Sequence, residues 1–582
     1  MWVSLGVIPV FFPEVTMLPR WFPFPSFAGV AAALLLTVSC SSEGPRPDAP
    51  ASRTEVTSSN NYEDLLTLFK DWRAFAAPAA PDYSADAMTA QFGELARYQR
   101  RLEAIDSSGW PVAQQVDHVL VRAEMNGLDF DHRIRRPWAS IPAFYATVFA
   151  AQSDTPAREG TGADGWMINL WTYDYPLTDG DAERLAAQLQ TVPPLLLQAQ
   201  SNLVEDARDL WVGGIRDMRV QASTLEALAE RVSGTRTALD DAIGQAHDAT
   251  VQFTAWLEDE LPAKHGPSGV GKENLNWYLQ NVHLVNYTWD EEVALMQHEL
   301  ARSHTTLHLI EHRNRDLPPL PVVTSAEEYD RRFNASVDEF IGFLDREEIV
   351  TVRDYMAPAL RAKIGSFSPV PAVGPRGFFS EVSYRDPVAM RTHSFHWTEI
   401  ARIENEPHSN PIRRGPALSN IWGQRSEGLA TGMEEWMMHA GLFEDRPRGK
   451  EIIQIMLAQR AARALGGLMM HGEGYTIEEA SEFAAKWTPR GWMPADSETV
   501  LTEQHIYLQQ PGYGTSYLIG KIEIEKLMAE RALELGDGFT VKGFMDELST
   551  AGVIPVSLVW WELTGDDSQI PRLVPLERFL NE

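Results

Sequence analysis

Apolar residues recur at helical spacing along most of this chain, and this periodicity constrains the fold more than any other feature of the sequence. After Tyr62, large apolar side chains fall on one face of a helix, namely Leu65, Leu66, Phe69, Trp72 and Phe75. Amphipathic stretches of the same kind continue over residues 87–260, interrupted by Pro and Gly. Strand signals are few and short. We therefore predict a predominantly α fold, one large helical domain over residues 62–582 with a central cleft.

Helix-start signals place several of the expected helices. Thr288, Thr324 and Thr476 each precede a glutamate by three residues, which is the pattern of a capping box. The helix that follows Thr288 is expected to run to about Asn314. Residues 366–383 are rich in Pro and Gly and partly β-like, so an irregular segment or a small hairpin is expected there.

The first residues have the layout of a bacterial lipoprotein signal. An apolar core ends in small residues at Cys40, the only cysteine in the chain, so no internal disulfide can form. We interpret residues 1–39 as a signal peptide, with Met17 before Arg20 as an alternative start, and Cys40 as the lipidation site. Residues 40–61, rich in Ser and Pro, are interpreted as a flexible tether. The alternative is an ordinary cleaved signal in a secreted protein.

The net charge limits the partners. The chain has 81 acidic and 50 basic residues, which gives a formal charge of −31. Such a surface repels nucleic acid and the anionic face of a membrane. We therefore expect a peptide or small-molecule ligand, no nucleic acid, and membrane attachment only through a lipid anchor. The predicted location is the bacterial cell envelope, lipid-anchored or periplasmic or secreted.

Histidine and glutamate concentrate between Arg391 and Met438. The groups of the first run are His393, His396, His408, Glu399, Glu404 and Glu406. Glu427 and Glu434 follow, seven residues apart, so on a helix both side chains point the same way. Zinc binds imidazole nitrogen and carboxylate oxygen, and this pattern favours the site of an α-helical zinc peptidase. The usual His-Glu-x-x-His signature is absent.

Three blocks of the sequence resemble the bacterial domain-of-unknown-function 885 family (DUF885), whose members look like α-helical zinc metallopeptidases of the thermolysin-like clan. The blocks span residues 271–302, 426–445 and 509–527. In the second block Glu427 matches the glutamate that is the third zinc ligand of the family. In the third block Tyr517 matches the tyrosine of a Pro-Gly-x-x-x-x-Tyr-x-x-Gly pattern. The resemblance implies a helical fold, a zinc site and peptide hydrolysis.

The chain departs from the family at its zinc motif, His-Glu-x-x-Pro-Gly-His. The stretch that we align with this motif keeps Glu404 and Pro407, but Ile403 and Ser409 stand at the two histidine positions. Isoleucine cannot coordinate zinc, so the family site cannot assemble as written. Either the metal is lost or nearby histidines take over.

A rewired site would hold zinc through His396, His408 and Glu427. Glu404 would act as the general base, and Tyr517 would stabilise a developing oxyanion. The cations that could bind substrate carboxylates are Lys521, Arg413 and Arg414.

Three functions remain open at this point. The first is a cell-envelope lipoprotein that hydrolyses peptides at a rewired metal site. The second is a catalytically inactive derivative that binds peptides or cell-wall fragments, as the replacements at Ile403 and Ser409 suggest. The third is a metal-free hydrolase that works with paired carboxylates.

Overall fold

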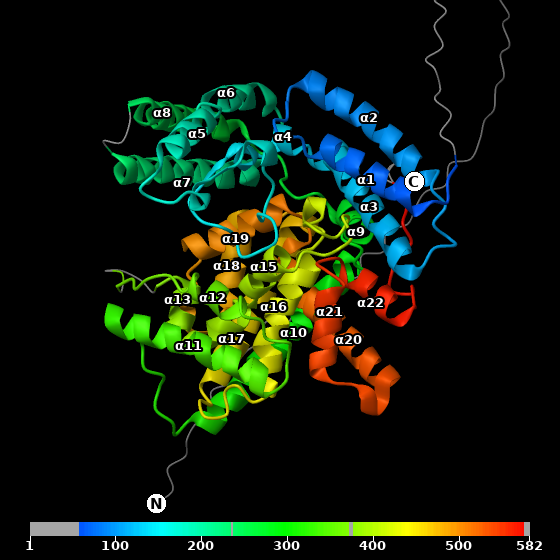
Figure 1. Cartoon of the computed structure of the whole chain (residues 1–582). Coiled ribbons are helices and arrows are strands. Elements are labelled where there is room, and N and C mark those ends of the chain that lie inside the picture. Colours follow the sequence, from blue (N-terminus) through cyan, green and yellow to red (C-terminus); the bar gives the residue numbers. More distant parts are fainter. Residues whose placement is uncertain (1–57, 234–236, 370, 372–375, 576–582) are drawn as a thin grey trace, which may run out of the picture. The chain divides into compact units, whose positions relative to one another are not determined.

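The computed structural model describes residues 58–233, 237–369, 371 and 376–575 (Figure 1). The predicted signal peptide, the lipidation site Cys40 and nearly all of the tether lie outside these residues. Within them the chain is predominantly helical, as the sequence predicts. The only strands among these residues are β1 and β2, of two residues each. None of these helices combines the length and the apolar character that a membrane span needs.

The described chain is a succession of helices, α1 to α22, given in chain order. The first are α1 (Tyr62–Ala76), α2 (Ala85–Glu103), α3 (Val112–Phe130), α4 (Pro137–Ser140), α5 (Asp179–Leu189), α6 (Val192–Asn202), α7 (Arg208–Val232) and α8 (Thr237–Glu260). Next come α9 (Lys272–Asn281), α10 (Trp289–Asn314), α11 (Ala326–Arg346), α12 (Met356–Arg361), α13 (Phe378–Ser383), α14 (Pro387–His393) and α15 (Phe395–Asn405). The last are α16 (Gly423–His439), α17 (Gly449–Gly472), α18 (Ile477–Trp487), α19 (Glu498–Gln509), α20 (Tyr513–Leu535), α21 (Val541–Thr550) and α22 (Val556–Thr564).

Two of the three predicted helix starts carry the expected caps. Thr288 and Thr476 form complete capping boxes at the starts of α10 and α18, and α10 ends at Asn314 as predicted. The third prediction is wrong by one residue, because the side chain that caps α11 is that of Ser325. Of the two alternatives for residues 366–383, the irregular segment agrees with those residues of 366–377 that the structure describes, whereas residues 378–383 form the short helix α13 and not a hairpin.

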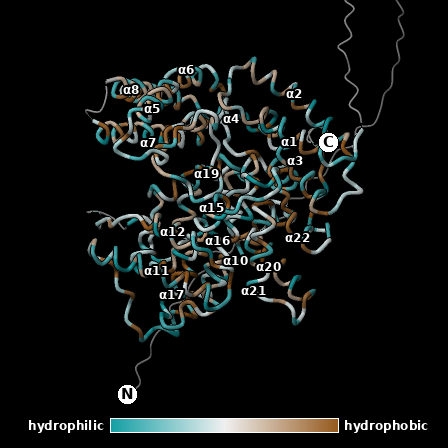
Figure 2. The backbone as a smooth tube through the Cα atoms, viewed as in Figure 1, coloured by the Kyte–Doolittle hydropathy of each residue, from teal (hydrophilic) through white to brown (hydrophobic). Residues whose placement is uncertain are grey.

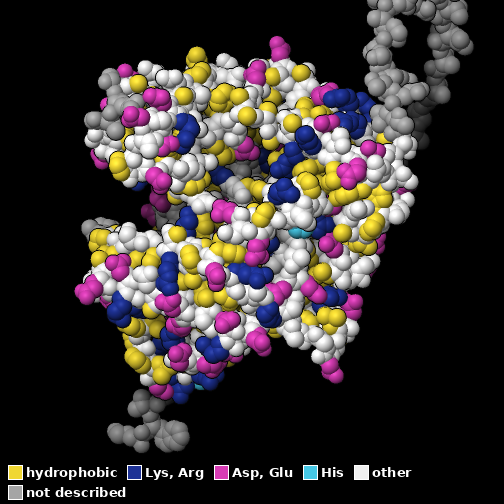
Figure 3. Space-filling view, viewed as in Figure 1, with side chains coloured by type: hydrophobic (Ala, Val, Ile, Leu, Met, Phe, Trp, Pro, Cys, Tyr) yellow, Lys and Arg dark blue, Asp and Glu magenta, His cyan; other side chains and the backbone are white. Residues whose placement is uncertain are grey.

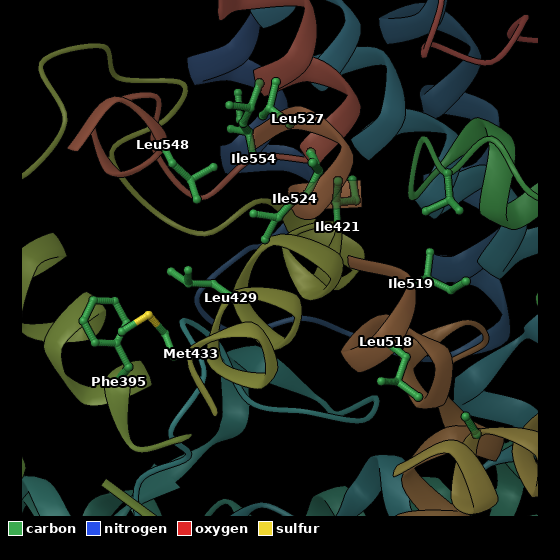
Figure 4. Packing of buried hydrophobic residues seen from close by; sticks show 14 of the residues in the cluster. Phe395, Ile421, Leu429, Met433, Leu518, Ile519, Ile524, Leu527, Leu548 and Ile554 are labelled. Atoms are coloured by element: carbon green, nitrogen blue, oxygen red, sulfur yellow. The ribbon is translucent and has the colours of Figure 1, made fainter. Parts of the chain in front are cut away.

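A large apolar core surrounds α16, α17 and α20. Nearly every residue of α17 is buried, so this helix lies inside the protein with other helices around it. Figure 4 shows Leu429 and Met433 of α16 with Leu518 and Ile519 of α20 among the residues of this core. Gly428 and Gly520 let α16 and α20 approach closely, because a Cβ at either glycine would collide with the backbone of the opposite helix.

A second apolar core lies between helices α5, α6, α7 and α8, which form a layer at the upper left of Figure 1. The alternation of apolar and polar residues along these helices is visible in Figure 2. Three tyrosines from the α19–α20 region, Tyr507, Tyr513 and Tyr517, belong to this second core. They mark where the two cores meet, because they come from the α19–α20 region and pack with residues of α5–α8. Figure 3 shows a hollow between the α5–α8 layer and the α11–α13 region.

The loop over residues 150–167, called here the β1–β2 loop, is fixed at its base. Strand β1 (Val148–Phe149) pairs in parallel with β2 (Ile168–Asn169), so the two ends of the loop lie side by side. Further along, Gly160 N–H donates to Gln510 Oε1 at 2.9 Å, just before α20. A long loop held in this way at both base and middle can position side chains for function.

Candidate functional site

Two histidines and two glutamates pair where α14, α15 and α16 meet. His396, in the first turn of α15, places its Nε2 3.0 Å from Oε2 of Glu427. His393, the last residue of α14, places its Nδ1 3.0 Å from Oε1 of Glu434. The two imidazole rings are edge to face with centroids 5.0 Å apart. The seven-residue spacing of Glu427 and Glu434 therefore brings both carboxylates to this pair of rings, in agreement with the expected shared helix face.

Asp154 of the β1–β2 loop completes a set of metal-binding groups. One donor atom each from Asp154, His393 and His396 lies within 4.8 Å of the other two, and this is the only such group among the residues described. These three residues are called the His–Asp cluster below. Two imidazoles and a carboxylate are a donor set that suits zinc and related divalent metals. The histidines are buried and Asp154 is partly exposed, so the cluster opens toward the loop.

The His396–Glu427 contact is a buried ion pair. Burial by itself would lower the pKa of His396, but the adjacent Glu427 carboxylate outweighs it and raises this pKa to about 9. Burial would likewise raise the pKa of Glu427, but His396 lowers it to about 2. At neutral pH the metal-free pair is therefore imidazolium and carboxylate. A metal ion that binds His396 must displace its proton.

A further layer of contacts orients both rings. Glu434 receives two hydrogen bonds from the guanidinium of Arg460, at 2.9 and 2.6 Å, deep in the core. Arg460 also places its Nη2 3.2 Å from Nδ1 of His393. The Nδ1 atom of this ring is therefore occupied, and Nε2 is the nitrogen that remains available to the cluster. Ser426 places its hydroxyl 3.2 Å from Nδ1 of His396. Such outer contacts fix the orientation of metal-binding histidines in proteins.

A carboxyl group that titrates near neutral pH lies beside the cluster. Burial, with the charges of Asp154 and Glu427, raises the pKa of Glu159 to about 7. Its Oε2 accepts a hydrogen bond of 2.6 Å from Ser153, and its Oε1 lies 3.2 Å from the hydroxyl of Tyr513. A carboxyl group with this pKa can both take and give a proton at neutral pH.

The tyrosine that reaches Glu427 is Tyr513, whose hydroxyl donates to Oε1 of that carboxylate. Tyr517, the predicted oxyanion-stabilising residue, is buried next to it with ring centroids 5.8 Å apart. The guanidinium groups of Arg460 and Arg463 lie 5.8 and 5.4 Å from the centroid of the Tyr517 ring. Tyr517 thus packs between cations and aromatic rings in the wall behind Glu427.

The structure brings together two of the predicted metal ligands, His396 and Glu427, and places the other two predicted residues elsewhere. His408 follows the end of α15 and accepts a hydrogen bond of 3.1 Å from Asn410 N–H at its Nδ1. Glu404 is exposed near the end of α15, where its charge acts on Lys363. Neither belongs to the His–Asp cluster.

Two of the three predicted substrate-binding cations are already paired with carboxylates, of which Asp117 and Glu435 are buried. Arg413 contacts Asp117 at 2.7 Å and Glu562 at 2.6 Å. Lys521 lies between Glu435 and Glu525, at 2.8 and 2.7 Å. These contacts join helices to one another and leave each cation neutralised.

The third cation, Arg414, is exposed. It donates to the backbone carbonyls of His408 and Ser409, at 3.3 and 3.2 Å. Its guanidinium holds the turn after α15.

Sequence reasoning missed Asp154 and Glu159. Both lie in the β1–β2 loop, which has no periodic pattern and is far from the His- and Glu-rich stretch along the chain. The only available signal was the length of this polar segment between helical regions, since long ordered loops often carry function.

Comparisons with known proteins agree with this fold. The profile of the family described as bacterial protein of unknown function (DUF885) matches residues 75–370 and 396–562. A solved structure described as a presumed lipoprotein of unknown function from Shewanella oneidensis superposes with a TM-score of 0.61 at 15% identity, covering 86% of this chain and 97% of that one. A second presumed lipoprotein, from Colwellia psychrerythraea, gives 0.55 at 14% identity, covering 87% and 97%. No curated protein sequence matches the chain.

Proposed function

This chain belongs to the DUF885 family, and from that premise we propose that it is an envelope hydrolase of peptides whose reaction centre is the His–Asp cluster with Glu427. The observation that carries the proposal is the convergence of Asp154, His393 and His396 to within 4.8 Å. These residues come from a loop and from two helices. Such convergence of buried imidazoles and a carboxylate is costly unless the groups are paired or bind a ligand.

The contact between His396 and Glu427 favours a different alignment of the family motif. If His396 is the second histidine of His-Glu-x-x-Pro-Gly-His, its contact with Glu427, the residue matched to the third ligand, is explained directly. Counting back six positions then puts Met390 at the first histidine and Arg391 at the glutamate. Neither residue can serve as metal ligand or base, so His393 and Asp154 take the ligand role in this proposal.

The residues present fit a metal ion of the zinc type. Asp154, His393 and His396 would supply one oxygen and two nitrogen donors and leave the fourth position of zinc open, while Glu427 orients His396. Zinc in such a set supplies Lewis-acid activation of a carbonyl group. The outer contacts of Glu434 and Arg460 with His393 match what metal-binding histidines require.

The general base in this proposal is Glu159. Its pKa of about 7 lets it take a proton from water and return it to a leaving amine near neutral pH. Tyr513 bridges Glu159 and Glu427, so the hydroxyl holds both carboxylates in place on one side of the cluster. The partly exposed Asp154 lies on the side from which a peptide would approach.

The test combines metal analysis with matched variants. The purified protein is analysed for bound zinc and for cleavage of a mixed peptide library, with and without chelator. His393→Ala should abolish both metal binding and cleavage, whereas His408→Ala, a histidine outside the cluster, should change neither. Glu159→Gln should lower kcat by roughly 100-fold or more while zinc stays bound, with Glu404→Gln as the matched control. Absence of zinc and of cleavage in the wild type would refute the proposal.

One observation favours a second candidate, a peptide-binding protein without catalysis. Both histidines already have a carboxylate oxygen at 3.0 Å, Glu427 for His396 and Glu434 for His393, so each ring has a partner without a metal. In that case the wild type would bind no zinc at neutral pH, and His393→Ala would lower stability without affecting ligand binding.

The envelope location rests on the sequence and on the neighbours. The signal-like stretch ends at Cys40, and two solved structures with this fold are described as presumed lipoproteins. Replacing Cys40 by Ala should move the protein from the membrane fraction to the soluble fraction. An unchanged membrane fraction would argue for a secreted or differently anchored protein.

A further inference from the structure

A cavity of about 350 Å³ lies against the β1–β2 loop. Its walls come from the α1–α2 connection, the end of α3, the segment around α4, the loop itself and Gln510. Ligand-binding pockets commonly have volumes of roughly 300–1,000 Å³. None of the roles assigned above uses this cavity.

One side of the cavity is apolar. Trp138 and Phe144 line it together with Met167 from the β1–β2 loop. Phe144 lies before the loop and Met167 is its last residue, so the base of the loop positions this wall. A surface of this kind takes an aliphatic or aromatic side chain.

The other side offers a hydrogen-bond donor that lacks an acceptor. Gln510 is 2% exposed, and its Oε1 accepts from Gly160 N–H at 2.9 Å and from Asn420 Nδ2 at 2.8 Å. These two bonds fix the amide, and its Nε2 is buried without a hydrogen-bond partner. An unsatisfied buried donor costs about 1–3 kcal/mol. A carbonyl oxygen of a ligand would satisfy it.

A guanidinium group that already has a carboxylate partner lies in the same lining. The side chain of Arg135 is 8% exposed and lines the cavity. Its Nε lies 3.1 Å from Oδ1 of Asp131, but the geometry gives neither atom a hydrogen bond. The lining holds the carboxylates of Glu124, Asp131 and Asp164 and the guanidinium groups of Arg135 and Arg158, and Glu124 is paired with Arg73 at 2.6 Å, so the charges around the cavity largely balance. A neutral ligand with apolar side chains and carbonyl oxygens fits this lining better than an ion does.

The β1–β2 loop is a common wall of the cavity and of the candidate reaction centre. Arg158 and Gly160 line the cavity, while Glu159 between them contacts Tyr513, which holds Glu427. Consecutive residues of this loop thus contact the cavity and the candidate reaction centre.

We propose that this cavity is a specificity pocket that binds an apolar side chain of a peptide, with the adjoining carbonyl oxygen accepting from Gln510. The assignment of the peptide as substrate rests on the proposed function, whereas binding itself does not require catalysis. The ligand class is thus an uncharged peptide segment with a large aliphatic or aromatic residue.

The experiment measures binding separately from cleavage. Chelator-treated protein is titrated calorimetrically with N-acetyl-phenylalanyl-leucine amide and with the polar counterpart N-acetyl-seryl-serine amide. The first should bind at least tenfold more tightly. Ala77→Trp, at the exposed mouth of the cavity, should weaken this binding at least tenfold, and Ala79→Trp, exposed two residues further on and outside the lining, should not change it.

A second variant addresses the donor itself. Gln510→Glu keeps the oxygen that accepts from Gly160 and Asn420 but removes the unsatisfied donor, and it should also weaken binding of the apolar probe. Equal binding of both probes, or full binding by Ala77→Trp and Gln510→Glu proteins with wild-type circular dichroism, would overturn the pocket assignment. Binding of the apolar probe without cleavage of any peptide would keep the pocket and refute the hydrolase. Cleavage of peptides by the Ala77→Trp protein with an unchanged KM would keep the hydrolase and refute the pocket.

Discussion

Replacing Glu427 by Gln tests the electrostatics of the candidate site in the metal-free protein. Glutamine has nearly the same shape and can still contact His396 and Tyr513, so the change removes mainly the negative charge. The pKa of His396 lies at about 9 instead of 6.5 because of this carboxylate. At 1.36 kcal/mol per pKa unit, the ion pair contributes about 3 kcal/mol to stability. The lowered pKa of Glu427 reports the same interaction and is not added to it.

The sign of the pH dependence follows from the two shifts. The pKa of His396 is raised, so its contribution is complete below pH 6.5 and is lost as pH rises through about 9. The pKa of Glu427 is lowered, so its contribution is complete above pH 4.5 and is lost as pH falls through about 2. The ion pair is therefore fully effective only between pH 4.5 and 6.5. The penalty of Glu427→Gln should be largest there.

The assay is urea unfolding of chelator-treated protein at three pH values. At about pH 5.5 the variant should lose about 3 kcal/mol of unfolding free energy, and at about pH 9.5 most of this difference should be gone. Glu404→Gln, which alters an exposed carboxylate, should show no such pH-dependent difference. A penalty for Glu427→Gln that is equal at both pH values would show that the charge of His396 does not depend on Glu427.

Three other perturbations test the packing and electrostatics around the site. Burial raises the pKa of Glu292 to about 8. The ionisation of this carboxyl group should therefore lower the free energy of unfolding by about 5 kcal/mol between pH 4.5 and 8. Glu292→Gln should remove this loss in urea unfolding measured across that range. Gly520→Ala should lower stability by several kcal/mol because its Cβ meets the backbone of α16, whereas Gly244→Ala, with open space around it, should leave stability unchanged or raise it by up to about 1 kcal/mol in thermal unfolding. Arg460→Met leaves Glu434 buried without its guanidinium partner and should cost about 3–5 kcal/mol, again by urea unfolding; a cost under 1 kcal/mol would show that Glu434 finds another partner.

Local signals in the sequence sufficed for the helical fold and for part of the site. The capping boxes at Thr288 and Thr476 depend only on residues within one turn, so they are readable without tertiary information. The same holds for the spacing of Glu427 and Glu434, because a helix of known period decides which of its residues share a face. A shared face does not show what it contacts, however. His396 and His408 were equally available partners for Glu427 on the sequence, and only His396 reaches it.

The sequence by itself determined that this chain forms helices, where several of them begin, and that two glutamates of α16 act on the same side. The tertiary structure alone decided which groups meet them, because Asp154 and Glu159 stand in an aperiodic loop whose path is set by the β1–β2 pairing and by Gln510. It also decided that Glu404 faces solvent and that Arg413 is enclosed by carboxylates. Periodicity fixes relative directions within one element, whereas a reaction centre depends on how separate elements pack, and no local pattern encodes that packing.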